Sequence, residues 1–197
     1  SKAVLDYIFY LMEAGYNIQA VRGNHEQLLL NAINDKTTFQ DFASKGGLDT
    51  LDSFNTDTVD DIPDRYIEFI NALPFYIELD DFFIVHAGFN YLSSDLFSDR
   101  DSMLHIRYFV FDPEKNHYKT IIHGHYATPL EDIMYHVIER KNSRINIDNG
   151  CVYSHREGMG IFIVLNLNDL SYFIQPCLDN HNYEHSVNKR RYYKNKG

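Results

Sequence analysis

The sequence predicts an α/β fold in which helices pack on a mixed β-sheet. Apolar residues recur at helical spacing in the first third of the chain, whereas short apolar runs bounded by Gly, Asn and Asp dominate the second half. Histidine also stands close to glycine directly after several apolar runs. Ligands usually bind at the carboxyl ends of strands in open α/β sheets, so this pattern favours the same fold class.

Several stretches carry a helical pattern. The predicted helices cover residues 1–14, 24–34, 63–72 and 102–109, and a mixture of short helix and loop is expected over 39–55. Gly15 is a suitable stop for the first helix, because glycine tolerates the backbone conformation that ends helices. Asn24 is a suitable N-cap for the second helix, and Pro63 suits the first turn of the third.

The strand predictions rest on apolar or alternating runs that lie between turn residues. The predicted strands cover residues 17–21, 75–79, 82–86, 120–123, 144–152, 160–167 and 171–175. Asp80 and Asp81 separate two of these runs, which predicts a hairpin. The run after them is apolar throughout, which is typical of a central strand.

The composition predicts a globular protein. The chain has 197 residues, of which 44% are hydrophobic and 15% aromatic, enough for one domain with a substantial core. No apolar run approaches the roughly 18 residues that span a bilayer, and no signal peptide opens the chain. We therefore expect no membrane partner. Cys151 and Cys177 lie beside apolar residues, and reduced, partly buried thiols would be consistent with a cytoplasmic protein.

The charge balance is acidic. Lys and Arg number 18 against 28 Asp and Glu, which gives a net charge of −10. This balance argues against nucleic acid as a partner, because nucleic-acid binding needs cationic groups opposite the phosphates. The basic segment 181–197 is the exception. A flexible, solvated end is one interpretation of it, and a docking patch for an acidic partner is another.

Three predicted strand ends carry groups that can bind a metal ion. They are Gly23-Asn24-His25-Glu26, His86-Ala87-Gly88 and His123-Gly124-His125. If the strands are neighbours, Asn24, His86 and His125 offer an amide oxygen and two imidazoles, a partial ligand set suited to Mn²⁺, Fe or Zn²⁺. Arg22 adds a planar guanidinium suited to phosphate. Each pattern alone also fits ordinary turn chemistry or surface charge.

Five segments resemble the motifs of one enzyme family. They are VRGNHEQ, FIVHAG, MLHIR, IIHGHYATP and INIDNGCVY. In order and spacing they resemble the calcineurin-like metallophosphoesterases, and most of all the bacterial and bacteriophage-type Ser/Thr protein phosphatases, over residues 1–167. The resemblance implies a four-layer α/β/β/α sandwich with mixed sheets over residues 1–180, followed by the basic tail at 181–197.

The resemblance also implies a site with two divalent metal ions, Mn being favoured over Fe or Zn. Asn24, His86 and His125 would ligate one of these ions. The family's GDxHG and GDxxDRG motifs, which supply ligands to the other ion and a bridging carboxylate, are absent from this sequence. We therefore expect the chain to be the C-terminal portion of such a domain, without its first strands.

By the same resemblance, the reaction would be hydrolysis of a phosphomonoester by a hydroxide that bridges the two metals. His25 would protonate the departing Ser or Thr oxygen, and Arg22 and Arg107 would bind phosphate oxygens. Glu26 would orient its neighbours, and His123 would be structural or lie at the rim. The expected partner is a phosphoprotein or phosphopeptide substrate.

Some positions depart from the family pattern without removing a ligand. They are His105, Tyr126 and Asn149, where Trp, Thr and Thr are common. Two alternative functions stay open. One is a dinucleoside polyphosphate hydrolase of the same family, although a Glu at position 26 favours phosphoproteins. The other is a truncated, non-catalytic fragment that binds one metal or a partner.

Overall fold

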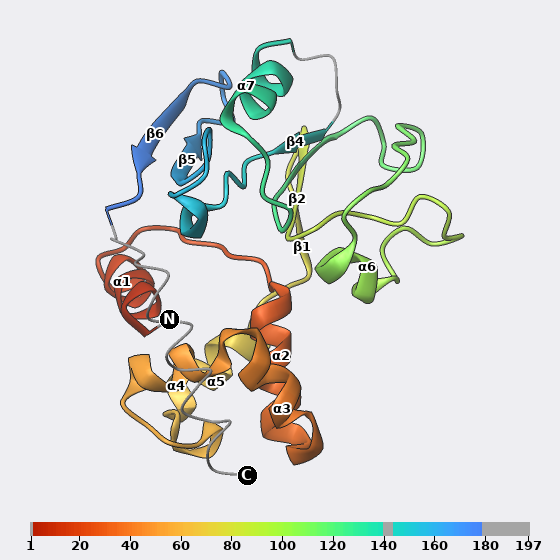
Figure 1. Ribbon diagram of the computed structural model, residues 1–197. Helices are drawn as coiled ribbons and strands as arrows, with labels where there is room; N and C mark the ends of the chain where they lie inside the picture. The colour runs from red at the N-terminus through yellow and green to blue at the C-terminus, as the bar shows by residue number, and fades with distance from the viewer. Residues whose placement is uncertain (1, 140–143, 179–197) are drawn as a thin grey trace. The chain divides into compact units, whose positions relative to one another are not determined.

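The computed structural model describes residues 2–139 and 144–178 of the chain (Figure 1). They form two compact units. The first runs to His125 and includes Arg144 and Ile145, and the second contains the remaining residues from Tyr126 onward. The predicted basic tail at 181–197 lies outside the described residues. Within the described ranges, no helix is long and apolar enough to cross a membrane.

The first unit begins with helices. They are α1 (Lys2–Glu13), α2 (Asn24–Asn34), α3 (Phe39–Phe42), α4 (Leu48–Phe54), α5 (Asp64–Ala72) and, later in the chain, α6 (Arg100–His105). Short 3₁₀ or π segments lie between some of them: η1 (Lys36–Thr38), η2 (Ala43–Gly47) and η3 (Val59–Asp61). The predicted helices over 1–14, 24–34 and 63–72 are confirmed, as is the mixture of short helix and loop over 39–55.

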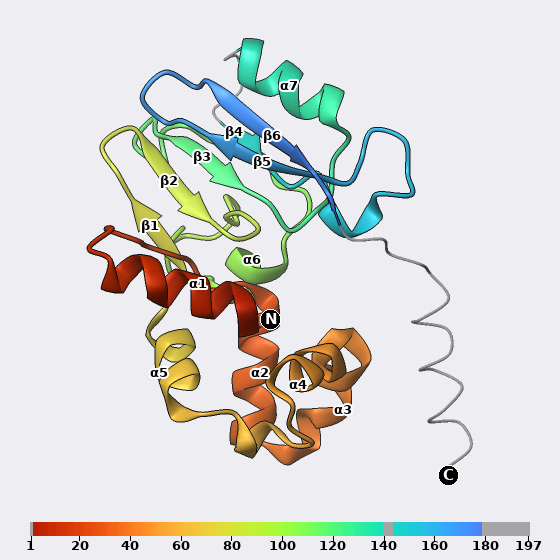
Figure 2. The ribbon, with the colours of Figure 1, turned by 90° about the vertical axis from the view of Figure 1, so that its left-hand side faces the viewer.

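A four-stranded mixed sheet follows the helices. Its strands are β1 (Tyr76–Glu78), β2 (Phe82–Val85), β3 (Thr120–His123) and β4 (Arg144–Asn146), in the spatial order β1-β2-β3-β4 (Figure 2). β1 and β2 form the predicted antiparallel hairpin. β2 runs parallel to β3, with Phe82 opposite Thr120, so β2 is a central strand as its apolar sequence predicts. The α/β fold class with a mixed sheet is thereby confirmed.

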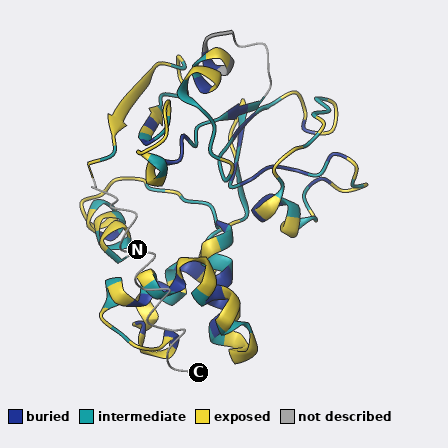
Figure 3. Cartoon of the chain, in the orientation of Figure 1, coloured by how far each residue is buried: buried dark blue, intermediate teal, exposed yellow. Residues whose placement is uncertain are grey.

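The second unit contains α7 (Leu130–Glu139), η4 (Cys151–Tyr153) and an antiparallel pair, β5 (Ile161–Leu165) and β6 (Tyr172–Pro176). The pair confirms the strands predicted near 160–167 and 171–175. β6 is exposed along its whole length (Figure 3). Cys151 is exposed rather than partly buried, whereas Cys177 is half-buried.

The structure corrects two helix boundaries. Gly23, rather than Asn24, is the N-cap of α2, with an extended backbone at φ −97° and ψ 173°. The helix predicted over 102–109 spans Arg100–His105 instead. It begins early because the carboxylate of Asp99 accepts a hydrogen bond from the N–H of Ser102 (3.0 Å) and so caps the helix. It ends early because the backbone turns extended after His105.

Two strand predictions are wrong. Residues 17–21 are extended, yet no strand in the described part of the chain pairs with them, and a strand requires a ladder of hydrogen bonds. The strand predicted over 144–152 ends at Asn146. Beyond it, the side chain of Asn146 accepts a hydrogen bond from the N–H of Asp148 (2.8 Å), whose own carboxylate accepts one from Gly150 (2.8 Å). These side chains turn the backbone away from the sheet.

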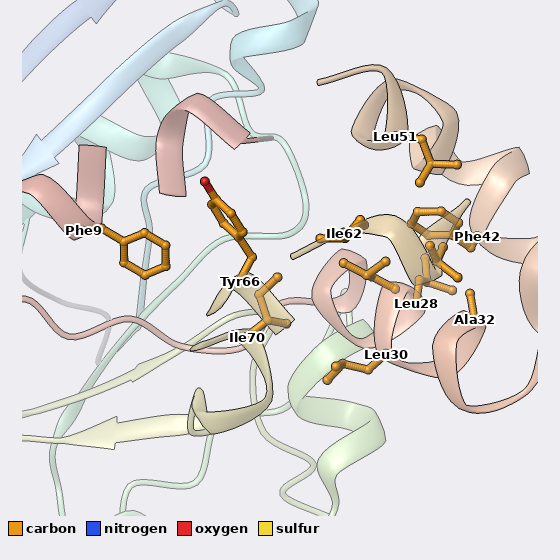
Figure 4. Close-up of a cluster of buried hydrophobic side chains, with 11 residues drawn as sticks. Phe9, Leu28, Leu30, Ala32, Phe42, Leu51, Ile62, Tyr66 and Ile70 are labelled. Atoms are coloured by element: carbon orange, nitrogen blue, oxygen red, sulfur yellow. The ribbon is translucent and has the colours of Figure 1, made fainter. Parts of the chain in front are cut away.

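The helical part of the first unit has its own hydrophobic cluster, shown in Figure 4. Leu28, Leu29 and Leu30 are all buried although they are consecutive, so α2 is covered on several sides by its neighbours. The other buried members are Phe9, Ala32, Phe42, Leu51, Val59, Ile62, Tyr66 and Ile70. This packing fixes the position of α2, whose first turn carries the predicted site residues.

A further cluster lies against the sheet and fixes β2 and β3. Phe83 and Ile121 face each other in register across the two strands, and both have no exposed surface. Phe89 and Met103 pack with them, together with Val85, Tyr91 and Leu96. The N–H of Ala87 also donates a hydrogen bond to the carbonyl of Met103 (2.9 Å), which ties α6 to the loop after β2.

Candidate metal centre

His86 and His125 leave the sheet at the same edge. His86 directly follows β2 and His125 lies two residues beyond the end of β3. Because these strands are parallel neighbours, their carboxyl ends coincide. The N–H of Gly124 donates a hydrogen bond to the carbonyl of His86 (2.9 Å), which locks the two loops together.

The structure brings Asn24, His86 and His125 together, and we call this group the Asn–His–His cluster. His86 Nε2 lies 2.9 Å from Asn24 Oδ1 and 3.0 Å from His125 Nδ1. The two imidazole rings meet edge to face, with their centroids 4.9 Å apart. Residues from distant parts of the sequence therefore bring an amide oxygen and a second ring nitrogen to within 3.0 Å of His86 Nε2.

The two distances from His86 Nε2 suit a shared divalent cation. Two ligand atoms that each lie about 2.1 Å from a metal at a right angle are about 3.0 Å apart, which matches the two distances measured from His86 Nε2. Without a cation, the cluster is poorly matched, since His86 Nε2 can either donate one proton or accept one, and so cannot form a full hydrogen bond with both neighbours. The amide oxygen and the two ring nitrogens are all ordinary metal ligands.

The cluster contains no carboxylate or thiolate side chain, and only two of its three members are histidines. In the described part of the chain, no group of three or more His, Cys, Asp or Glu side chains is placed to hold a metal ion. The third candidate ligand, Asn24, is an amide, which carries no charge. Three neutral ligands would leave room for further ligands on a bound cation, such as water or a phosphate oxygen.

Burial keeps His86 uncharged. Burial, followed by the proximity of His125, His25 and His105, lowers the pKa of His86 to about 4. At neutral pH the ring is therefore neutral, which is the form that ligates metals, so no proton has to be displaced from it on binding.

Acidification is expected to destabilise the metal-free protein through His86. Because folding lowers its pKa to about 4, the unfolded chain binds the extra proton from roughly pH 6.5 down to pH 4, and the free energy of unfolding falls over that window. A half-buried ring should contribute roughly 1–2 kcal/mol. Urea unfolding at about pH 7 and about pH 4.5 measures this loss. His86→Gln should lose less stability, and equal losses in both proteins would contradict the prediction.

His125 has a strained backbone. Its φ is +71°, in the left-handed region of backbone conformation that residues other than glycine rarely adopt. Such conformations persist where the surrounding structure imposes them, and they are common at functional sites. Here the strain turns the ring of His125 back toward His86.

The close approach of Glu26 and His86 explains why position 23, in the turn before α2, is a glycine. A Cβ at this position would lie 2.6 Å from Glu26 Oε2 and 3.2 Å from His86 Nδ1. The N–H of Gly23 donates to that Glu26 oxygen (3.0 Å). Glu26 thus holds the turn that precedes Asn24, and its role in orienting site residues stays a prediction.

Arg22 is anchored to the protein. Its Nη1 donates to Gln27 Oε1 (3.0 Å) and its Nη2 donates to the carbonyl of Asn71 (2.6 Å). Its guanidinium carbon lies 4.9 Å from the centre of the Phe75 ring. These contacts tie the turn before α2 to the end of α5 and the start of the sheet. The predicted contact with phosphate stays a prediction.

Replacement of Arg22 by alanine is expected to lower the free energy of unfolding by about 2 kcal/mol, because two hydrogen bonds from a charged donor are lost. Arg100→Ala is a matched control. Arg100 lies over the same Phe75 ring at 5.0 Å, so its loss should remove only the cation–π contribution of about 0.5–1 kcal/mol. Urea unfolding measures both values, and equal effects would contradict the anchoring role of Arg22.

The structure places the remaining predicted residues as follows. His25 is exposed in the first turn of α2, next to Asn24 and close enough to His86 to influence its charge. Arg107 is exposed just beyond α6. His123 is the last residue of β3, and its ring packs edge to face on Phe109 at 5.5 Å between centroids. The acid role of His25 and the phosphate role of Arg107 stay predictions.

The structure adds His105 to the surroundings of the site. Its ring lies 6.3 Å from that of His125, centroid to centroid, and its Nδ1 is 3.0 Å from Asp101 Oδ1. From the sequence, His105 stands out only as a departure from a family pattern. The spacing of Asp101 and His105, four residues apart in a predicted helix or at its edge, was the available signal.

Comparisons of this chain with protein-family models, with curated proteins and with solved structures found no match.

Proposed function

We propose that this chain carries the metal-binding part of a phosphomonoester hydrolase that acts on Ser/Thr phosphoproteins. One observation supports the proposal above all others. Asn24 Oδ1, His86 Nε2 and His125 Nδ1 converge, at 2.9 and 3.0 Å from atom to atom, at the carboxyl edge of a mixed sheet. The four-layer sandwich of the calcineurin-like metallophosphoesterases belongs to the same proposal.

The residues of the cluster and those around it can each have a separate role in hydrolysis. Asn24, His86 and His125 would hold a divalent cation, with Mn favoured. Such a cation, when bound, withdraws electron density from the phosphoryl group. The exposed ring of His25 can give a proton to the departing serine or threonine oxygen, which is a poor leaving group without it. Arg107 can bind a phosphoryl oxygen through its planar guanidinium.

Metal analysis followed by a hydrolysis assay tests this function. After dialysis against MnCl₂, the protein should retain manganese, and a longer polypeptide that contains it together with the GDxHG and GDxxDRG motifs should hydrolyse a phosphoserine peptide in a manganese-dependent way. Diadenosine tetraphosphate serves as the competing substrate, because a dinucleoside polyphosphate hydrolase would prefer it. A protein that retains no divalent metal would overturn the proposal.

A second candidate is a fragment that binds one metal and does not hydrolyse phosphate esters. It is favoured by the composition of the Asn–His–His cluster, whose amide oxygen and two ring nitrogens include no carboxylate that could bridge to a second metal. One tightly held metal per chain without turnover of either substrate would support this candidate.

A further inference from the structure

A pocket of about 410 Å³ opens within the helical part of the first unit. Its walls come from α1, α2, α4, α5 and η2, and from the extended segment just before α2. Phe42 and Ile70, two of its lining residues, are shown with the surrounding cluster in Figure 4. This volume falls within the range of about 300–1,000 Å³ that is typical of ligand pockets.

The pocket reaches two residues next to the Asn–His–His cluster. His25 and Glu26 line it, and they directly follow Asn24 of the Asn–His–His cluster. His25, which is exposed, therefore lines the pocket and directly follows Asn24 of the cluster. A molecule that places a phosphate at the cluster can extend a neighbouring group into this pocket.

The chemistry of the lining favours an apolar group. Leu29, Phe42 and Ile70 contribute buried apolar surface. Lys45, a cation of the lining, is already paired with Asp41 at 2.8 Å, and the lining also contains the carboxylates of Glu26 and Asp49. A polyphosphate chain needs an excess of positive charge, which this lining does not offer.

Two glycines shape the wall formed by η2. A Cβ on Gly47 would lie 2.5 Å from the ring of Phe42, so only glycine allows this close approach. Gly46 has a φ of +93°, which glycine adopts without strain. The two glycines let the chain bend tightly around Phe42 and leave space beside it.

We propose that this pocket binds a bulky apolar side chain, such as Leu, Met or Phe, that lies close in sequence to the phosphorylated Ser or Thr of a protein substrate. This inference rests on the proposed function, because it takes the phosphate to lie at the Asn–His–His cluster. It assigns substrate selection to the helical part of the unit.

Peptide binding in the presence of MnCl₂ tests the pocket directly. The probes are fluorescent alanine-rich peptides that carry a non-hydrolysable phosphonate analogue of phosphoserine, with one leucine placed in turn at each neighbouring position. Fluorescence anisotropy should show that leucine at one preferred position tightens binding at least about tenfold over alanine, as expected for filling an apolar pocket. Equal affinities for all peptides would overturn the inference.

Two variants on α1 connect the effect to the pocket. Val4 and Tyr7 are both 62% exposed, but only Val4 lines the pocket. Val4→Asp should remove most of the leucine advantage, whereas Tyr7→Asp should leave it unchanged. Equal loss of the advantage in both variants would place the leucine elsewhere and overturn the inference.

Unphosphorylated peptides separate this inference from the proposed function. If the leucine advantage persists and is equal with serine or its phosphonate analogue, the pocket stands while the phosphatase proposal fails. If the phosphonate strengthens binding but leucine does not, the phosphatase proposal stands and the pocket inference fails. Stronger competition by diadenosine tetraphosphate than by any peptide, sensitive to Val4→Asp, would also overturn the inference.

Discussion

Replacement of His86 by alanine is expected to abolish metal retention by this protein. His86 Nε2 is the atom that lies within 3.0 Å of both Asn24 Oδ1 and His125 Nδ1. Its removal takes away the central one of the three proposed ligand atoms. Loss of a residue that merely orients a ligand costs about 10–100-fold in metal affinity. Loss of a ligand itself should therefore cost at least about 100-fold.

Equilibrium dialysis against MnCl₂ with metal analysis measures this loss. His117→Ala is the matched control, because His117 is an exposed histidine that no cluster contact involves. The control should retain as much manganese as the unchanged protein. The circular dichroism spectrum of His86→Ala should match that of the unchanged protein, which would show that the metal is lost because a ligand is missing and not because the protein is unfolded. Full retention of manganese by a folded His86→Ala protein would remove the basis of the proposed function.

Local patterns in the sequence were sufficient for many elements of the fold. α1, the β1–β2 hairpin and β3 each contain their own signal, whether helical spacing, turn residues or an apolar run. α7 carried such a signal too, since Pro129 precedes it and Glu131 and Asp132 occupy its first turn. The sequence predictions contain no helix over 130–139, so α7 is an element that only the structure reveals.

Elements that depend on distant partners could not be predicted in the same way. Residues 17–21 have the composition of a strand, but a strand also needs a neighbour with which to exchange hydrogen bonds. In the described part of the chain, the nearest such contact is a single bond from the N–H of Arg22 to the carbonyl of Pro74 (2.8 Å). β4 is short for a different reason, because Asn146 and Asp148 bind the backbone and end it.

In the candidate site, too, some features could be predicted from local sequence patterns and others depend on distant partners. Glycine–histidine pairs after apolar runs predicted that Asn24, His86 and His125 would meet, and the structure brings them together. The anchoring of Arg22 could not be predicted, because its acceptor in Asn71 lies 49 residues away in the sequence. A guanidinium suited to phosphate is equally suited to a carbonyl oxygen, and only the folded chain decides between them.

Replacement of His25 by asparagine is expected to lower the kcat for a phosphoserine peptide by about 10²–10⁴-fold, the usual contribution of a general acid. Hydrolysis of p-nitrophenyl phosphate should fall far less, because nitrophenolate leaves without a proton. Parallel kcat measurements on the two substrates give the ratio of the two losses in kcat, which is the quantity that tests the acid role. They can be made on this chain or on a longer polypeptide that contains it.

Asparagine is the appropriate replacement because it fills similar space and still forms hydrogen bonds, but it cannot donate a proton as an acid. His25 is exposed, so the substitution should leave the fold intact and manganese retention unchanged. These two controls separate an acid from a ligand, since loss of a ligand would release the metal and slow both substrates alike. Equal losses of kcat on the phosphoserine peptide and on p-nitrophenyl phosphate, with manganese retained, would therefore exclude His25 as the acid and leave the Asn–His–His cluster as a metal site without an assigned proton donor.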